Sequence, residues 1–261
     1  MSNAFTRRRL IGLGSAIALL PLWAQQGAVA AAGRNNPAAT QGKGDPEAMK
    51  DGDAGAGPKS KVIGIVLFDA FETLDVFGPV QMWGRLADHR LIFVSADGGA
   101  VTSAQGTVVN ADASFASAPQ LDILMVPGGM GTRPLVKERA LLDFVRRQDR
   151  ATRWTASVCT GAAILASAGL LDWRDATTNK LAFDWVAGQS DKVRRQRKAR
   201  WVFDGKYATS SGVSAGTDMA LALVERLYGR EAAEHAATIA EYRWHDDAAD
   251  DPFAPSAAAK P

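Results

Sequence analysis

Apolar segments of strand length, separated by segments with helical periodicity, constrain the fold of this chain most. The strand-like segments are residues 62–68, 91–94, 121–126 and 154–158. Near-continuous apolar runs of this length are typical of strands that are buried on both faces of a sheet. Strands that alternate with helices favour a mainly parallel sheet with helices on both faces. We therefore predict an α/β fold of the sandwich type.

The segments between these strands predict the remaining elements and the position of a site. Helices are expected at residues 79–87, 140–150, 161–168, 219–228 and 231–242, a peripheral strand at 107–115, and a hairpin around Asp204-Gly205 at 201–211. Ligands of parallel sheets bind at the carboxyl ends of the strands. Asp75, Gly128-Gly129 and Cys159 each follow a different expected strand. We expect these three segments to meet at one edge of the sheet.

The charge balance argues against a nucleic acid or a membrane surface as a partner. The chain of 261 residues has 30 basic and 28 acidic side chains. Three of the basic residues lie within residues 1–30, which hold no acid, so the rest of the chain is nearly neutral. Binding to phosphate backbones or anionic lipid relies on an excess of basic residues. The basic stretch at residues 192–200 has no interleaved aromatic residues, and we predict a solvated loop there.

Residues 1–30 have the pattern of an export signal. Arg7, Arg8 and Arg9 precede a short apolar run, and Ala28-Val29-Ala30 matches the small-residue site that signal peptidase cleaves. The apolar run is too short to span a bilayer. An uncleaved anchor is the alternative. We predict a twin-arginine-type signal peptide, and therefore a periplasmic protein without stable membrane insertion after cleavage.

The rest of the chain divides by composition into three parts. Residues 31–60 contain almost nothing to bury, which predicts a flexible linker. Residues 61–253 hold all the expected strands and helices and are predicted to form one α/β domain. Residues 254–261 are rich in Ala and Pro and are expected to be a disordered tail.

Cys159 is the candidate nucleophile. It is the only cysteine, and with three scattered histidines it gives no recognisable spacing of metal ligands, so no metal site is predicted. The segment Ser157-Val158-Cys159-Thr160-Gly161 lies between an expected strand and an expected helix, as in a nucleophile elbow. The start of a helix favours a thiolate over a thiol. Because the neighbours are apolar, an inert buried cysteine is the alternative.

Asp75 is the candidate acid–base residue. Its neighbours Leu74 and Val76 are apolar, so its carboxyl is expected to be drawn inward, and burial would raise its pKa. A carboxyl of this kind suits general acid–base catalysis. The alternative role is to cap a helix that begins near Pro79.

Backbone N–H groups near these side chains are candidates for anion binding. Those of Gly128, Gly129 and Thr160 could form an oxyanion pocket, although two glycines after a strand can also be only a tight turn. The loop at residues 210–216, which contains Gly212, is expected to line the same crevice. His245 is expected on the surface rather than in the site.

Four motifs taken together resemble the ThiJ/PfpI superfamily (class I glutamine amidotransferase-like), and within it the isonitrile hydratase-like branch. They are Leu74-Asp75-Val76-Phe77-Gly78-Pro79, Pro127-Gly128-Gly129, Ser157-Val158-Cys159-Thr160-Gly161 and Ala176-Thr177-Thr178. The resemblance covers about residues 61–253. It implies a flavodoxin-like α/β sandwich that forms a homodimer and uses no metal or organic cofactor.

The resemblance also implies roles for individual residues. Cys159 would be the nucleophile, Asp75 the acid that hydrogen-bonds to it, and Thr160 a group that steadies the thiolate. The backbone N–H of Gly129 would help to hold developing charge. The small-molecule substrate would be an isonitrile, hydrated through a thioimidate to an N-substituted formamide. Isonitrile hydratases carry His-Trp after the Ala-Thr-Thr motif, where this chain has Asn179-Lys180.

Two other functions remain open from the sequence. The chain could be a ligand-binding or redox-responsive module without turnover, or it could have a glyoxalase-like activity on reactive aldehydes. A DNA-binding regulator is not expected, because only about thirty residues follow Arg230.

Overall fold

The computed structural model describes residues 61–255. The predicted signal peptide, linker and end of the tail (residues 1–60 and 256–261) lie outside the described residues. The periplasmic location and the homodimer therefore stay predictions. No helix among the described residues has the length and apolar character needed to cross a membrane.

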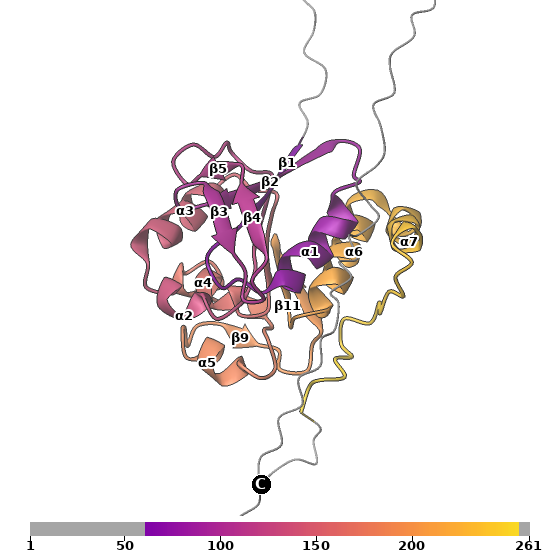
Figure 1. Cartoon of the computed structure of the whole chain (residues 1–261). Helices are drawn as coiled ribbons and strands as arrows, with labels where there is room; N and C mark the ends of the chain where they lie inside the picture. Colours follow the sequence, from indigo (N-terminus) through magenta and orange to yellow (C-terminus); the bar gives the residue numbers. More distant parts are fainter. Residues whose placement is uncertain (1–60, 256–261) are drawn as a thin grey trace, which may run out of the picture. The chain divides into compact units, whose positions relative to one another are not determined.

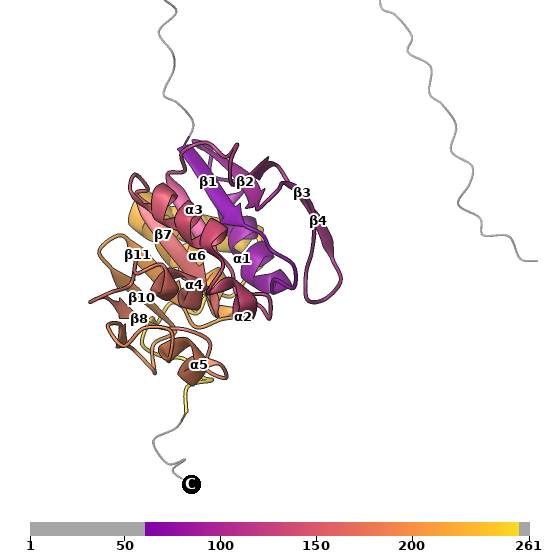
Figure 2. The ribbon, with the colours of Figure 1, turned by 90° about the vertical axis from the view of Figure 1, so that its left-hand side faces the viewer.

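A seven-stranded sheet forms the centre of the domain, in the order β10-β11-β7-β6-β1-β2-β5 (Figures 1 and 2). The strands are β1 (Lys61–Val66), β2 (His89–Ser95), β5 (Ala113–Ser114), β6 (Ile123–Val126), β7 (Trp154–Val158), β10 (Trp201–Asp204) and β11 (Tyr207–Ser210). All neighbouring pairs are parallel except β10 and β11, which form the predicted hairpin. The mainly parallel sheet is confirmed.

Helices cover both faces of this sheet (Figures 1 and 2). One face carries α1 (Thr73–Trp83), α6 (Ala215–Tyr228) and α7 (Arg230–Ile239), and the other carries α3 (Arg139–Asp149) and α4 (Gly161–Ser167). Smaller elements complete the domain: the hairpin of β3 (Gly99–Thr102) and β4 (Val108–Ala111), the pair of β8 (Asp175–Ala176) and β9 (Arg194–Arg195), and the short helices α2 (Thr132–Leu135) and α5 (Phe183–Ala187). The predicted flavodoxin-like sandwich is confirmed.

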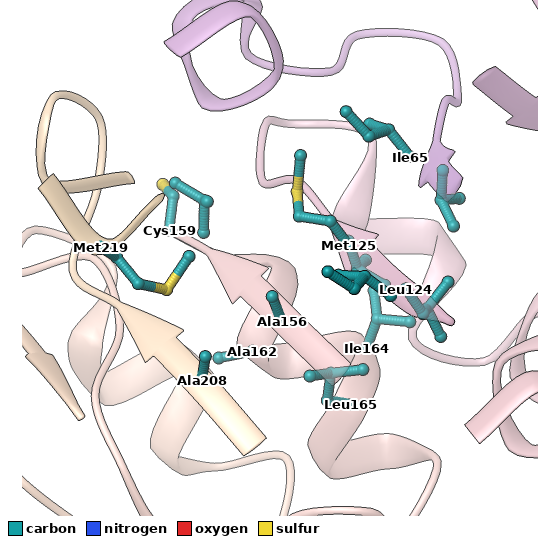
Figure 3. Packing of buried hydrophobic residues seen from close by; sticks show 14 of the residues in the cluster. Ile65, Leu124, Met125, Ala156, Cys159, Ala162, Ile164, Leu165, Ala208 and Met219 are labelled. Carbon is teal, nitrogen blue, oxygen red and sulfur yellow. The ribbon is translucent and has the colours of Figure 1, made fainter. Parts of the chain in front are cut away.

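The core lies between the sheet and its two helical layers. All four residues of β6 are buried, as expected for a central strand with both faces covered. Ala156 of β7, Ala208 of β11, Ala162 of α4 and Met219 of α6 are fully buried members of this core (Figure 3). Burial of this apolar surface is the main free-energy term that favours the fold.

The first helix begins earlier than the sequence predicts. We expected it to start at Pro79, but α1 begins at Thr73 and contains Pro79 in its interior. A proline inside a helix costs about 3 kcal/mol. Close packing against α6 offsets this cost: a Cβ on Gly78 would lie only 2.2 Å from Thr217 Oγ1. The earlier start matters because it places Asp75 on the helix.

The basic stretch at residues 192–200 is not wholly the solvated loop that we predicted. Arg194 and Arg195 form β9. Arg200 is buried, and its Nε donates a hydrogen bond of 2.8 Å to Asp218 Oδ2. Burying a charge is tolerated where a partner compensates it, and Asp218 is fully buried beside Arg200.

Candidate functional site

Cys159 lies at a sharp turn between β7 and α4 (Figure 3). Its φ is +56°, a left-handed conformation that is uncommon for a residue with a side chain. Hydrogen bonds hold both of its peptide groups: Cys159 N–H donates to Ser210 O at 3.2 Å, and Thr178 Oγ1 donates to Cys159 O at 2.7 Å. These contacts over-determine a strained backbone, as is common where a side chain must be aimed at a ligand.

Asp75 is fully buried in the first turn of α1. Gly128 N–H donates a hydrogen bond of 2.8 Å to Asp75 Oδ2. Glu72, not Asp75, occupies the N-cap position, so the alternative role of Asp75 as a cap is wrong. Asp75 Oδ1 is buried and has no hydrogen-bond partner of good geometry among the described residues. The Cys159 thiol interacts with this carboxyl and lowers its pKa, so the acid and the thiol are neighbours.

Thr160 links the elbow to the glycine loop that follows β6. Gly129 N–H donates to Thr160 Oγ1 at 3.0 Å, and the Thr132 hydroxyl donates to the same oxygen at 3.1 Å. The N–H groups of Gly128 and Gly129 thus already bond to protein side chains in this structure. They position Asp75 and Thr160, and their predicted action on a developing oxyanion stays a prediction.

Gly212 packs directly against the elbow. Its φ is +114°, and a Cβ at this position would lie 2.6 Å from Cys159 Cβ and 3.1 Å from Cys159 Sγ. No larger residue fits without moving the cysteine. The structure thus places this loop beside the cysteine, as we predicted.

Burial dominates the proton affinities of Cys159 and Asp75. It raises the pKa of Asp75 to about 8, while the Gly128 N–H lowers it, the nearby Glu72 carboxylate raises it and the Cys159 thiol lowers it. Burial and then the charge of Asp75 raise the pKa of the Cys159 thiol, while the Thr160 N–H and hydroxyl lower it. The thiolate expected from the helix start alone is not favoured. At neutral pH the pair holds a protonated acid beside a thiol.

The sulfur faces an open pocket rather than hydrocarbon on all sides. Cys159 is 6% exposed and lines a cavity of about 360 Å³ together with Glu72, Thr160 and Asn179, among others. We call this cavity the Cys159 pocket. Gly129 also lines it, and the side chains of Met130 and Leu181, which are exposed, stand at its rim.

Two residues of the Cys159 pocket were not predicted from the sequence. Arg133 comes from α2 and Trp185 from α5, and the guanidinium carbon lies 3.5 Å from the centre of the indole ring. Arg133 follows the glycine loop by only a few residues, which is the one signal that pointed to it. Trp185 lies 26 residues beyond Cys159, and nothing in its local sequence indicates that the chain returns to the pocket there.

The residues Asn179 and Lys180, where the sequence departs from the isonitrile hydratase pattern, have different positions. Asn179 lines the pocket, and its Oδ1 accepts a hydrogen bond of 2.9 Å from the N–H of Ala182. Lys180 turns away to bond to Thr177 Oγ1 at 3.0 Å and to approach Asp251 at 3.6 Å. Only Asn179 is therefore placed to touch a ligand.

His245 is not part of the pocket. Its Nε2 lies 2.9 Å from the carbonyl oxygen of Asp250, and its backbone N–H donates to Asp218 Oδ1. Across residues 61–255 no group of three or more His, Cys, Asp or Glu side chains could hold a metal ion.

These features define the class of protein: a flavodoxin-like sheet that carries a cysteine at a strained elbow, with a buried acid beside the cysteine. Residues 61–226 match the model of the DJ-1/PfpI family. The chain belongs to this family. The resemblance inferred from the four motifs is thereby confirmed.

Individual relatives have more than one described role. Isonitrile hydratase from Pseudomonas putida is 36% identical over 172 residues, which cover 66% of this chain and 74% of that enzyme. The HTH-type transcriptional regulator GbdR of Pseudomonas aeruginosa is 33% identical over 177 residues, which cover 65% of this chain but only 47% of the regulator. The relatives that share this level of sequence identity thus include both an enzyme and a regulator.

Solved structures agree with the fold. A ThiJ/PfpI family protein from Pseudomonas syringae superposes with a TM-score of 0.66 at 30% identity, over 82% of this chain and 87% of that one. Drosophila melanogaster DJ-1beta has a TM-score of 0.63 at 22% identity over 71% of this chain and the whole of that one, which shows the fold alone.

Proposed function

We propose that this chain is a cysteine-dependent enzyme that hydrates isonitriles to N-substituted formamides. One observation carries the proposal: Asp75, whose pKa is raised to about 8, stands beside the Cys159 thiol, and Cys159 lines a pocket. Similarity to an isonitrile hydratase over two thirds of the chain supports the choice of substrate.

An isonitrile needs the two groups that this site offers. Its terminal carbon accepts a nucleophile and must also receive a proton. The Cys159 sulfur forms a bond to that carbon, Asp75 donates its proton to the same carbon, and the thiol proton passes to Asp75. The product of this step is a thioimidate, R–N=CH–S–Cys159. A protonated carboxyl is suited to this work because it supplies a proton without bringing a second negative charge to the thiol.

Hydrolysis completes the cycle. Water adds to the thioimidate carbon, the C–S bond breaks, and a proton returns to sulfur while the formamide R–NH–CHO leaves. One water is consumed for each isonitrile. In the strained elbow the Thr160 N–H faces the sulfur, where it stabilises negative charge as the C–S bond forms and breaks.

Turnover of a simple isonitrile tests the proposal. The full chain is expected to convert isobutyl isocyanide to N-isobutylformamide, measured by chromatography. Cys159→Ala is expected to abolish conversion, and Asp75→Asn to lower kcat at least ~100-fold, because the amide keeps the Gly128 hydrogen bond but donates no proton. Asp97→Asn, at an exposed carboxyl, is the matched control and is expected to keep full activity.

Two outcomes would contradict this function. Conversion that survives in Cys159→Ala would exclude the cysteine mechanism. Absence of formamide, with lactate formed from methylglyoxal, would favour the glyoxalase-like alternative instead.

A further inference from the structure

The Cys159 pocket contains a positive charge that the proposed hydration chemistry does not use. The Arg133 side chain lines this pocket, and no described residue accepts a hydrogen bond from its guanidinium or forms an ion pair with it. Its Nη1 is buried and has no hydrogen-bond partner within residues 61–255. Buried guanidinium nitrogens are normally paired, so an Arg133 that lines a pocket without an anionic partner is suited to bind an anionic group of a ligand.

Trp185 fixes the orientation of this guanidinium. The stacking distance of 3.5 Å places the plane of the guanidinium against the face of the indole ring. Stacking uses the face of the group and leaves its edge, which carries the N–H donors, free to bond within the plane. This edge is the fork that matches the two oxygens of a carboxylate.

The pocket also holds one acid, which must be considered beside Arg133. Glu72 lies at the start of α1, and its Oε1 accepts a hydrogen bond of 2.9 Å from Gln105 Nε2. Its charge acts on Asp75 and Cys159, which places it at the catalytic end of the pocket. Arg133 belongs with Trp185, from α2 and α5, on the wall that these two short helices form. A substrate anion is therefore expected at the Arg133 wall and away from Glu72.

We propose that Arg133 binds a carboxylate on the substrate, so that the preferred substrate is a small isonitrile acid with its isonitrile carbon at Cys159. This inference rests on the proposed function for the reacting group, but the carboxylate contact is independent of it. The stacked Arg133 and Trp185 hold the carboxylate end of the substrate, and the Cys159 sulfur attacks the isonitrile carbon at the other end. Arg133 is thus a specificity-determining residue.

Two isosteric isonitriles test the inference by turnover. Isocyanoacetate and isobutyl isocyanide have the same number of heavy atoms, and only the first carries a carboxylate. Wild type is expected to prefer isocyanoacetate in kcat/KM, and Arg133→Gln to lower this preference roughly 10- to 100-fold, the range for a lost hydrogen bond to a charged group. Arg133→Lys is expected to restore part of the preference. Arg150→Gln, at an exposed arginine outside the pocket, is the matched control.

Binding of the products separates this inference from the proposed function. By calorimetry, N-formylglycine is expected to bind wild type more tightly than N-isobutylformamide does, and Arg133→Gln to remove the difference. Thermal unfolding of Arg133→Gln checks that the variant is folded. If no isonitrile is turned over but this binding pattern holds, the carboxylate site stands and the hydratase function fails. If folded Arg133→Gln keeps both the substrate preference and the binding difference, the inference is overturned.

Discussion

At the scale of single residues, the site depends on the protons that Cys159 and Asp75 both carry at rest. Both groups are buried, and burial raises both pKa values because each charged form loses hydration. The resting pair is therefore neutral at pH 7, and the thiol proton can pass to Asp75 only as Asp75 gives its own proton to the substrate. A neutral pair is easier to keep in a folded core than an isolated thiolate would be.

The raised pKa of Asp75 makes stability depend on pH in a defined direction. In the unfolded chain this carboxyl loses its proton near pH 3.8, and in the folded chain near pH 8. Between these values the folded state binds the extra proton, so its stability falls as pH rises, by up to about 1.4 kcal/mol per pH unit. Asp75→Asn removes this titration. The unfolding free energy of Asp75→Asn minus that of wild type, measured in urea, is therefore expected to increase from pH 5 to pH 8.

The comparison between variants isolates Asp75 from other titrating groups. Asp97→Asn is expected to follow wild type across the same pH range. A wild type that gains stability relative to Asp75→Asn as pH rises would mean that the Asp75 carboxyl is ionised in the folded protein, and the neutral resting pair would be wrong.

At the scale of elements, four neighbouring parallel strands bring the site together. Asp75 follows β1, Gly128 follows β6, Cys159 follows β7 and Gly212 follows β11. Because the carboxyl ends of parallel strands lie at one edge, residues far apart in sequence converge there. The loop after β11 then closes over the cysteine, with Gly212 at the point of contact.

Substitution of Gly212 is expected to damage the elbow specifically. Gly212→Ala forces its new methyl group against Cys159, so the sulfur must move, and a misplacement of about 1 Å can lower activity ~100-fold. Gly169→Ala is the matched control, because Gly169 also has a positive φ of +76° but nothing within 4 Å of its Cβ position. Gly169→Ala is expected to lose about 1–2 kcal/mol of stability from backbone strain, and Gly212→Ala more because of the added contact with Cys159. Only Gly212→Ala is expected to lose kcat/KM.

Equal activity losses in these two glycine variants would contradict the specific contact. Steady-state kinetics and urea unfolding of the same preparations separate the effect on catalysis from the effect on stability.

Elements with a clear pattern could be predicted from the sequence, and those decided by tertiary contact could not. The strands at residues 121–126 and 154–158 and the hairpin at Asp204-Gly205 follow from local composition. The start of α1 could not be predicted in this way. Pro79 favours a helix that begins there, but packing against α6 allows the helix to begin at Thr73. In the same way, the local sequence of Arg200 predicts a solvated basic run, and only the contact with Asp218, from another element, buries it.

At the scale of the whole molecule, the candidate site was only partly accessible to sequence reasoning. Cys159, Asp75 and the glycine loop could be predicted because each follows a strand whose position is clear. Arg133 and Trp185 could not, because they come from short helices whose packing over the sheet edge has no local pattern. The start of the helix predicted a lowered pKa for the Cys159 thiol. This prediction was wrong, because burial raises the pKa by more than the helix start lowers it.

The most direct test of the cysteine mechanism is the intact mass of the full chain during turnover. Because the chain has a single cysteine, an adduct can be assigned without ambiguity. Acid quenching of the wild-type protein with excess isonitrile is expected to trap a species heavier by the whole mass of that isonitrile, mapped to Cys159 and absent in Cys159→Ala. Formamide production with no such species, or an adduct on any other residue, would contradict a thioimidate at Cys159.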